Sequence, residues 1–372
     1  MAVVAGIDEA GYGPLLGPLA VTATAFRVPE EAAEADLWEL LRDAVARGAA
    51  RDGRRVRVAD SKKLHHGKAG IGPLERNVLP FLAAMSSHNG RLATEDTEVT
   101  ENGRSEFRNQ REGRIGAPDS EIRNRPSHLL RDESSAIQAI PDNVEAFLLA
   151  VAAPQVEGFA AYPWYRGKEQ RLPRAAAAEP MALGADCLRE GLAAAGAQLC
   201  MVRLELLEAA EFSREVTACD NKAQALGGRV AALMRTLWEQ FAAEGLWLTV
   251  DKQGGRNDYE AFLLANFYGC ALTRCCQSAQ RSRYTLRDGA RRMTVTFEPK
   301  ADAHHLPVAL ASMFSKYARE LMVEMLNEFW LQRVPGLRPT AGYHPDGQRF
   351  LEEIEAARQA ENIPIELLRR CR

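Results

Sequence analysis

The sequence predicts an α/β protein, because strand-like and helix-like segments are mixed along the chain. Leu246–Val250 is a short apolar run of the kind that forms a buried strand. Pro307–Trp330 has apolar residues at three- to four-residue spacing, as an amphipathic helix does. Acidic residues recur where predicted strands end, as Asp251 does after Leu246–Val250. These strand ends are therefore the first place to look for a function.

The N-terminal elements read as two strands and a helix. Ala2–Ile7 is apolar and ends at Asp8-Glu9, and Leu15–Phe26 continues with small and β-branched residues. We expect these two segments to form a hairpin near the centre of the sheet. Pro29–Arg47 is predicted to be a helix, with acidic residues in its first turn, where the helix dipole favours them.

The later elements continue the mixture of strands and helices. Asp288-Gly289 separates two strand-like runs and favours a type I′ turn, which needs positive φ angles. The remaining predictions are a helix at Asn143–Val151, a strand at Gln198–Leu206, a helix at Lys222–Ala243, and hairpin strands at Arg283–Arg287 and Arg292–Phe297.

One stretch lacks the composition of a packed domain. Residues 85–140 are rich in Arg, Glu, Asn and Ser and poor in aromatic residues. So little apolar surface cannot offset the entropy of ordering the chain. We expect a disordered or poorly packed insertion that splits one domain, formed by residues 1–84 and 141–372.

The composition is that of a water-soluble protein. The 372 residues are 46% hydrophobic, and no apolar run is long enough to cross a bilayer or to form a signal-peptide core. The seven cysteines form no CxxC pair, so we expect reduced thiols and a cytoplasmic location. The net charge of −3 gives no global sign of nucleic-acid binding. Basic runs at Arg51–Lys63, Arg166–Arg174 and Arg274–Arg292 are local candidates, although each fits a solvated face equally well.

Acids at three separate places suggest a site for cations. Asp8-Glu9 and Asp251 follow predicted strands, and Asp302 precedes the long predicted helix, where it could also be a simple cap. Successive strand residues point to opposite faces, so Asp8 and Glu9 meet one site only if the chain bends, which Gly11 and Gly13 permit. Crowded carboxylates need compensating cations, and an all-oxygen ligand set favours Mg²⁺ or Mn²⁺. A pair of such ions can catalyse phosphodiester chemistry. The acids alone do not identify the substrate.

Four motifs, in order, resemble those of the ribonuclease HII family within the RNase H-like superfamily. They are Gly6–Pro18 (GIDEAGYGPLLGP), Asp60–Leu64 (DSKKL), Ala301-Asp302 with Val308–Ser312 and Ser315-Lys316, and Gly342-Tyr343. The resemblance covers residues 1–84 and about 204–355. It implies a mixed central β-sheet flanked by helices, with a helical C-terminal region, in a divergent family member.

The resemblance also implies an activity and a set of site residues. Asp8, Glu9, Asp251 and Asp302 would be catalytic and would bind Mg²⁺ or Mn²⁺. A monomer would cut the RNA strand of RNA–DNA hybrids by a two-metal-ion mechanism and leave 3′-hydroxyl and 5′-phosphate ends. The substrate-binding residues would be Gly11, Tyr12, Gly13, Lys62, Ser312, Lys316 and Tyr343. Lys62 could instead be solvated, and Tyr343 could be a packed loop aromatic. The pairs His65-His66 and His304-His305 fit solvated loops better than metal ligands.

Two departures from the family pattern keep other functions open. Tyr12 stands where the family has arginine, and Lys252-Gln253-Gly254-Gly255 replaces a glycine–asparagine pair. One alternative is therefore a ribonuclease HIII-like preference for continuous hybrids. The other is a non-catalytic nucleic-acid-binding paralogue.

Overall fold

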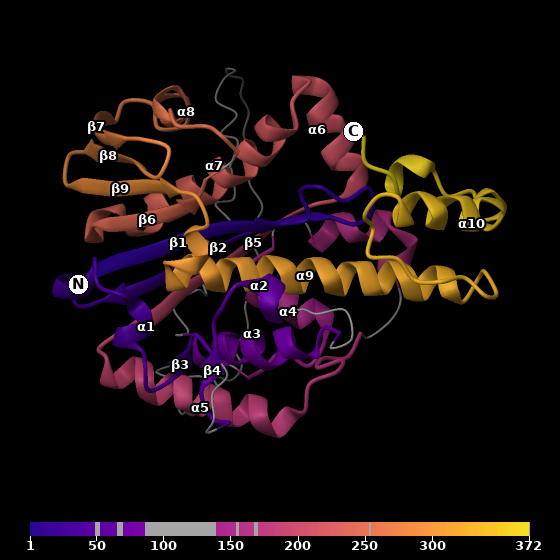
Figure 1. Cartoon of the computed structure of the whole chain (residues 1–372), viewed down its shortest axis with the longest axis horizontal. Helices are drawn as coiled ribbons and strands as arrows, with labels where there is room; N and C mark the ends of the chain where they lie inside the picture. Colours follow the sequence, from indigo (N-terminus) through magenta and orange to yellow (C-terminus); the bar gives the residue numbers. More distant parts are fainter. Residues whose placement is uncertain are drawn as a thin grey trace, which may run out of the picture. The chain divides into compact units, whose positions relative to one another are not determined.

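Seven strands form one mixed sheet in the order β5-β2-β1-β6-β9-β8-β7 (Figure 1). The computed structural model describes residues 1–48, 53–64, 70–85, 139–153, 156–166, 170–252 and 254–371. The strands are β1 (Ala2–Ala10), β2 (Leu19–Val28), β5 (Gln198–Leu207), β6 (Leu246–Asp251), β7 (Ala271–Gln277), β8 (Ser282–Asp288) and β9 (Arg291–Glu298). The strands β1, β6 and β9 are parallel to one another, and the other neighbours in the sheet are antiparallel.

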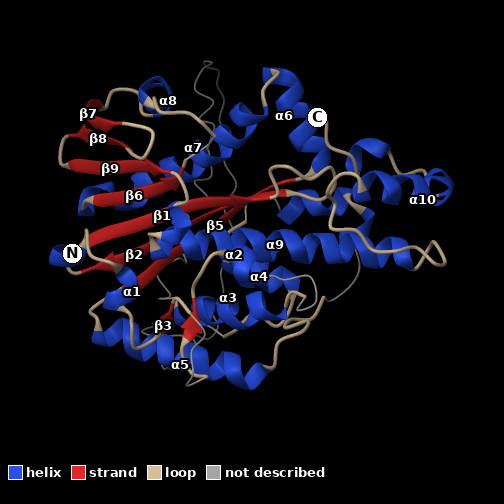
Figure 2. Cartoon of the chain, viewed as in Figure 1, coloured by secondary structure: helices blue, strands red, loops and turns tan. Residues whose placement is uncertain are grey.

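Helices cover both faces of this sheet (Figure 2). One face packs its apolar residues against α7 (Lys222–Phe241), together with α6 (Ala209–Cys219) and α8 (Glu260–Asn266). The other face packs against α9 (Leu306–Leu331), with α3 (Gly72–Ala84), α4 (Val144–Ala150) and α5 (Ala178–Ala194) in the same apolar core. The end of α9 joins α10 (Asp346–Ala360) in a third core. The predicted mixed sheet, flanking helices and helical C-terminal region are thus confirmed.

The smaller elements complete the described chain. The short strands β3 (Val45–Ala46) and β4 (Val56–Arg57) form a separate parallel pair. The short helices are η1 (Glu30–Ala32), α1 (Leu37–Leu40), α2 (Ser61–Leu64), η3 (Val156–Ala161), η4 (Pro163–Tyr165), η5 (Ala242–Glu244), η6 (Ala301–Ala303) and η7 (Ile365–Leu367). Within the described ranges, no helix combines the length and apolarity needed to span a bilayer.

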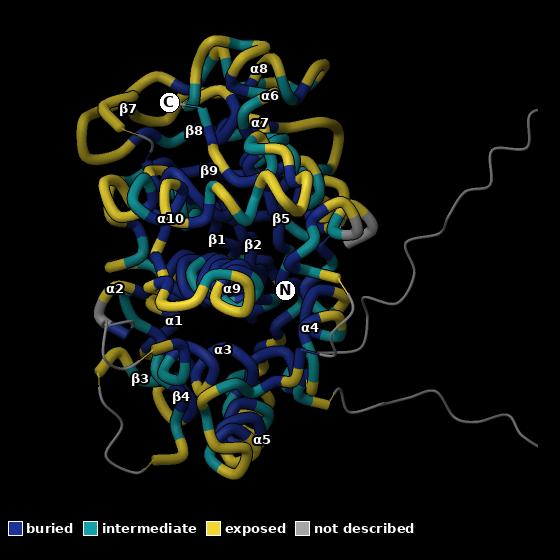
Figure 3. The backbone as a smooth tube through the Cα atoms, turned by 90° about the vertical axis from the view of Figure 1, so that its right-hand side faces the viewer, coloured by how far each residue is buried: buried dark blue, intermediate teal, exposed yellow. Residues whose placement is uncertain are grey.

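Helix α9 lies unusually close to the sheet. A Cβ atom on Gly6 of β1 would come within 2.3 Å of the Val308 nitrogen, so only glycine fits beneath the first turn of α9. The Thr24 hydroxyl of β2 also donates a hydrogen bond to the Pro307 carbonyl at 2.8 Å. The strands β1 and β2 and most of α9 are buried, whereas β7 at the sheet edge is exposed (Figure 3). This contact fixes α9 against the strand that carries Asp8.

Several predicted elements are confirmed and two are wrong. The N-terminal hairpin, the helices at 143–151, 222–243 and 307–330, and the strands at 198–206 and 246–250 occur with small changes of boundary. The single helix predicted at Pro29–Arg47 is wrong. That segment contains only η1 and α1 before Val45 pairs with Val56, because pairing and burial outweigh helix propensity there.

The hairpin turn also differs from the prediction. Asp288 pairs with Arg291, so the two loop residues are Gly289 and Ala290, and only Gly289 has a positive φ, at 57°. The predicted insertion at 85–140 lies almost wholly outside the described residues, as do His65 and His66.

Candidate active site

Two of the predicted acids lie on neighbouring parallel strands. Ile7 of β1 pairs with Val250 of β6, so Asp8 and Asp251 follow side by side at the same edge of the sheet. The chain does not bend between Asp8 and Glu9, because β1 stays in regular register with β2 through Ala10. Both carboxylates nevertheless lie within electrostatic range of Asp251. Asp251 ends its strand at the rim, where residues on either side of β1 can approach it.

Burial and like charge raise the pKa values of these acids. Asp8 is only 7% exposed, and burial, followed by the charges of Glu9 and Asp251, raises its pKa well above the usual range. Burial and then Asp251 raise the pKa of Glu9 to about 7. The protein therefore keeps negative charge together at a cost in free energy, which is common at functional sites.

A hydrogen bond from the residue before Asp302 links the segment of Asp302 to Asp251. The amide of Ala301 donates a hydrogen bond to the Asp251 carboxylate at 2.8 Å. This bond holds η6 against the end of β6 and places Asp302 in the field of Asp251. Burial comes first among the causes that raise the pKa values of both acids, and the charge of Asp302 adds to the rise for Asp251.

Two residues of the DSKKL motif face this group of acids. The Lys62 ammonium lowers the pKa values of Glu9, Asp251 and Asp302, so it lies near all three. Asp60 accepts a hydrogen bond from the Lys62 amide at 2.9 Å, and its charge raises the pKa of Asp302. Asp60 is a fifth carboxylate that the sequence prediction did not assign, although its motif was recognised.

Serines of α9 hold Asp8 in place. Ser312, predicted to contact substrate, is buried and hydrogen-bonds the Asp8 side chain. Its hydroxyl also lies 3.1 Å from the Ser61 hydroxyl. The Ser315 hydroxyl lies 3.0 Å from the Asp8 carbonyl and 2.8 Å from the Thr22 hydroxyl. Ser312 thus contacts the Asp8 carboxylate, while its predicted contact with substrate stays a prediction.

The donor set suits a hard divalent cation. Within the described ranges, no three Asp, Glu, His or Cys side chains already lie close enough to chelate one ion. Asp8, Glu9, Asp251 and Asp302 offer only oxygen donors, the ligands of Mg²⁺ and Mn²⁺. Burial is the first cause of their raised pKa values, and the charges of neighbouring acids add to the rise. By charge and donor type, the group fits a divalent metal ion.

We call the loop after β1, which carries Gly11, Tyr12 and Gly13, and the loop that carries Tyr343 the rim loops. Gly11, with a φ of 88°, begins the loop that follows β1, and Tyr12 is 38% exposed on it. Burial and the charge of Glu9 raise the pKa of Tyr12. Gly13 is exposed and has open space around it. Lys316 instead pairs with Glu320 at 2.7 Å, which reduces the charge it can offer to a phosphate.

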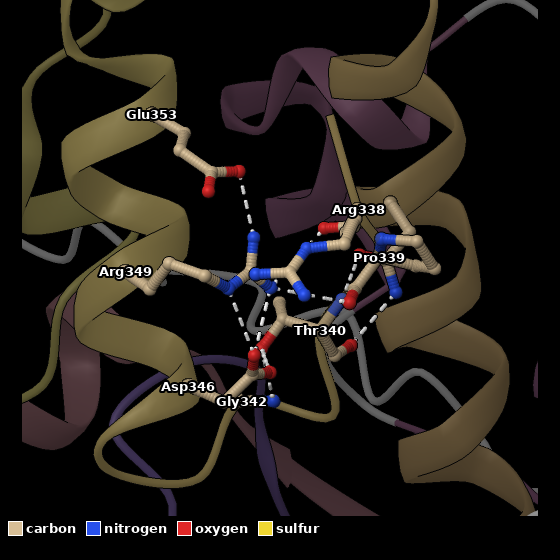
Figure 4. Close-up of polar contacts among 8 residues, drawn as sticks. Arg338, Pro339, Thr340, Gly342, Asp346, Arg349 and Glu353 are labelled. Carbon is tan, nitrogen blue, oxygen red and sulfur yellow. Dashed lines mark hydrogen bonds and ion pairs between the residues drawn. The ribbon is translucent and has the colours of Figure 1, made fainter. Parts of the chain in front are cut away.

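Tyr343 lies on a loop that is fixed by hydrogen bonds and an ion pair among neighbouring residues. Its ring is 47% exposed and lies 5.2 Å from the Arg319 guanidinium. The Thr340 hydroxyl bonds the Asp346 carboxylate at 2.5 Å and accepts from the Gly342 amide at 3.0 Å (Figure 4). Arg349 pairs with Asp346 at 2.7 Å in the same network. An exposed ring on a rigid loop is well placed to stack on a ligand.

Comparison with known proteins gives matches among solved structures alone. No protein-family model and no curated protein sequence matches this chain. Among solved structures, it is similar to RNase HII from Archaeoglobus fulgidus in a complex with PCNA, with 16% identity, 99% of this chain and 93% of that chain covered, and a TM-score of 0.41.

Two further solved structures are similar to a comparable degree. The chain matches ribonuclease H2 from Pyrococcus horikoshii OT3, with 14% identity, 99% and 92% coverage and a TM-score of 0.38. It also matches Bst-RNase HIII in complex with Mn²⁺, with 13% identity, 99% and 66% coverage and a TM-score of 0.39.

Proposed function

We propose that this chain is a metal-dependent endoribonuclease that hydrolyses the RNA strand of RNA–DNA hybrids. The observation that carries the proposal is the gathering of Asp8, Glu9, Asp251 and Asp302 from three separate segments at one edge of the sheet. Bringing several carboxylates together is costly unless a cation compensates their charge, and such a group can hold divalent cations over a phosphodiester.

These four acids would hold Mg²⁺ or Mn²⁺. Two such ions, when bound, would supply an activated water and stabilise the leaving oxygen. We propose that the products carry 3′-hydroxyl and 5′-phosphate ends. Ser312 and Ser315 would keep Asp8 in a fixed orientation through its side chain and carbonyl. Lys62, already beside three of the acids, would attract the negatively charged backbone of the substrate.

The rim residues favour a nucleic acid that contains ribose. Gly13 is exposed with open space around it, so the backbone of the loop there is accessible to a 2′-hydroxyl, the group that separates RNA from DNA. Tyr343 would stack on a sugar or base beside the cut. These features support a hybrid substrate over duplex DNA.

The test is cleavage of an RNA–DNA hybrid with Mg²⁺ or Mn²⁺. We expect the wild-type chain to cut it and Asp8→Asn to lose the activity. Asp186→Asn is the matched control, because Asp186 is an exposed acid that pairs with Arg189 on α5. Equal activity in Asp8→Asn and wild type would refute the proposal.

The two alternatives give different outcomes in the same assay. A ribonuclease HIII-like enzyme would cut a continuous hybrid but leave a duplex with one embedded ribonucleotide intact. A non-catalytic paralogue would bind hybrid with strong salt dependence and without turnover. It would also show no heat of Mn²⁺ binding in calorimetry.

A further inference from the structure

The loop from Gly11 to Gly17 is held from the inside by a distant arginine. Arg370 is almost fully buried, and its two terminal nitrogens donate hydrogen bonds to the carbonyls of Gly11 and Gly17. Its own amide donates to the Leu15 carbonyl at 3.0 Å, and Arg369 forms a β-bridge with Leu16. One guanidinium thus spans both ends of the loop.

This contact determines which way one peptide group faces. In a planar trans peptide the C=O and the N–H point in opposite directions. Because the Gly11 carbonyl points inward to Arg370, the amide of Tyr12 points outward, on the side of the loop away from the guanidinium. Within the described part of the chain, no residue accepts a hydrogen bond from this amide. Gly17 precedes Pro18, so the second carbonyl brings no corresponding donor.

A second buried arginine connects this loop to Tyr343. Arg319 is fully buried, donates to the Ala341 carbonyl at 2.7 Å and lies over the Tyr343 ring. A Cβ atom on Gly11 would lie 2.6 Å from the Arg319 side chain, so the positive φ of Gly11 and the arginine are mutually dependent. The amides of Leu15 and Leu16 both donate to the Gly342 carbonyl, at 2.8 and 3.2 Å. The two rim loops are therefore one connected unit.

We propose that Arg370 is a positioning residue for ribose recognition, which acts by turning the Tyr12 amide toward the bound RNA strand. The inference rests on the proposed function, because it assigns a substrate contact to the same site. The charge that the family pattern carries at position 12 is absent here, and a backbone donor oriented from beneath takes up part of its task. Arg370 itself does not touch the substrate.

The guanidinium of Arg370 stays charged at neutral pH although its surroundings disfavour the charge. Burial and the neighbouring charge of Arg319 lower the pKa of Arg370 to about 9, while Glu208 opposes that shift. The group therefore stays protonated at pH 7 and donates to both carbonyls. A lysine cannot span them, because its single ammonium lacks the planar fork of a guanidinium.

The experiment compares Arg370→Lys with the control Arg174→Lys. Arg174 is a largely buried arginine paired with Glu324 and Glu328, away from this loop. Hydrogen exchange at the Leu15 and Leu16 amides should become about tenfold faster in Arg370→Lys and stay unchanged in the control, since about one hydrogen bond's worth of local stability is lost.

The second measurement is binding preference in an Asp8→Asn background, where no cleavage is expected. The ratio of affinities for an RNA–DNA hybrid and the matching DNA duplex should fall about tenfold with Arg370→Lys, as expected for one lost hydrogen bond to the ribose. A general loss of stability would weaken both complexes and leave the ratio unchanged.

The outcomes separate this inference from the proposed function. Unchanged exchange at Leu15 and Leu16, equal effects of the two lysine variants, or an unchanged affinity ratio would overturn it. If the wild-type chain neither binds nor cuts hybrid, the proposed function fails. The ribose role fails with it, while the exchange result still decides whether Arg370 holds the loop.

Discussion

Two buried carboxylates, Glu75 of α3 and Asp8 of β1, have opposite surroundings. Glu75 is completely buried and accepts hydrogen bonds from the amides of Arg174, Ala175 and Ala176 at 2.7, 2.8 and 3.0 Å, and from the Tyr317 hydroxyl at 3.3 Å. Asp8 is almost as deeply buried, but the charges of two other acids reach it.

The difference shows that burial alone does not identify a functional acid. Glu75 has a donor for each lone pair that faces the protein, so it ties the segment 174–176 to α3 and α9. Asp8 has the Ser312 hydroxyl and the Glu9 amide as donors, and its like-charged neighbours outweigh them. A buried carboxylate that is repelled by neighbouring acids can be stabilised by a bound cation.

The largest effect expected from this contrast is at Asp8. Asp8→Asn should lower hybrid cleavage by at least about a thousandfold, as loss of a group used in the transition state does. It should also raise the free energy of unfolding without metal by about 1 kcal/mol, because one of several crowded charges is removed. Cleavage rates and urea unfolding in EDTA measure both. A less stable variant with normal activity would place Asp8 in the structural class.

Glu75 should behave in the opposite way. Glu75→Ala removes the acceptor of three part-buried backbone amides and empties a buried site, so it should lower the free energy of unfolding by about 2 kcal/mol. Mn²⁺ affinity should not change. Urea unfolding and calorimetry test these two statements, with the exposed Glu179→Gln as the control. A loss of Mn²⁺ binding in folded Glu75→Ala would contradict the assignment of Glu75 as a purely structural acid.

Glu208 is an intermediate case that sharpens the comparison. It accepts a hydrogen bond from Tyr165 at 2.9 Å and faces Arg370, yet burial raises its pKa to about 7. A raised carboxyl pKa favours the protonated form in the folded state. Stability is therefore greatest below the unfolded value of 4.5 and is lost as the pH rises to about 7.

Glu208→Gln should remove this pH dependence. Between pH 5 and 7.5 its free energy of unfolding should fall by about 2 kcal/mol less than that of the wild type. Urea unfolding at the two pH values measures the difference, and Glu211→Gln is the control on the same helix end. Parallel pH profiles of wild type and Glu208→Gln would contradict the prediction.

The smallest effect concerns protons that compete with metal. Glu9, with a pKa of about 7, must lose its proton to bind Mn²⁺. The Mn²⁺ affinity should therefore increase about tenfold per pH unit as the pH is raised toward 7, and it should become constant above pH 7. Calorimetry at pH 6 and 8 in buffers of different ionisation heat measures the affinity and the released proton. A pH-independent affinity would remove Glu9 from the proposed ligands.

The sequence predicted the strands and their terminal acids better than it predicted what surrounds them. Leu246–Asp251 has an apolar pattern that ends in an acid, so both the strand and the candidate ligand were visible. The donors to Glu75 come from residues about 100 positions away, and Arg370 lies 359 positions from Gly11. Such partners have no local signal. The helix predicted at 29–47 failed for a different reason, because the nearby short strand β4 pairs with Val45 and the helix pattern gave no sign of that pairing.

Helix α9 has a consequence for how this chain can vary. Along one continuous helix it carries Ser312 and Ser315 against Asp8, Tyr317 against Glu75, Arg319 against Gly11 and Asn327 against the Thr340 loop. Each residue of an α-helix turns by about 100° and advances by about 1.5 Å. A single inserted residue in the middle of α9 would rotate every later contact away from its partner at once. We therefore expect insertions to be tolerated in loops and not in the middle of α9, whose length sets the spacing of these contacts.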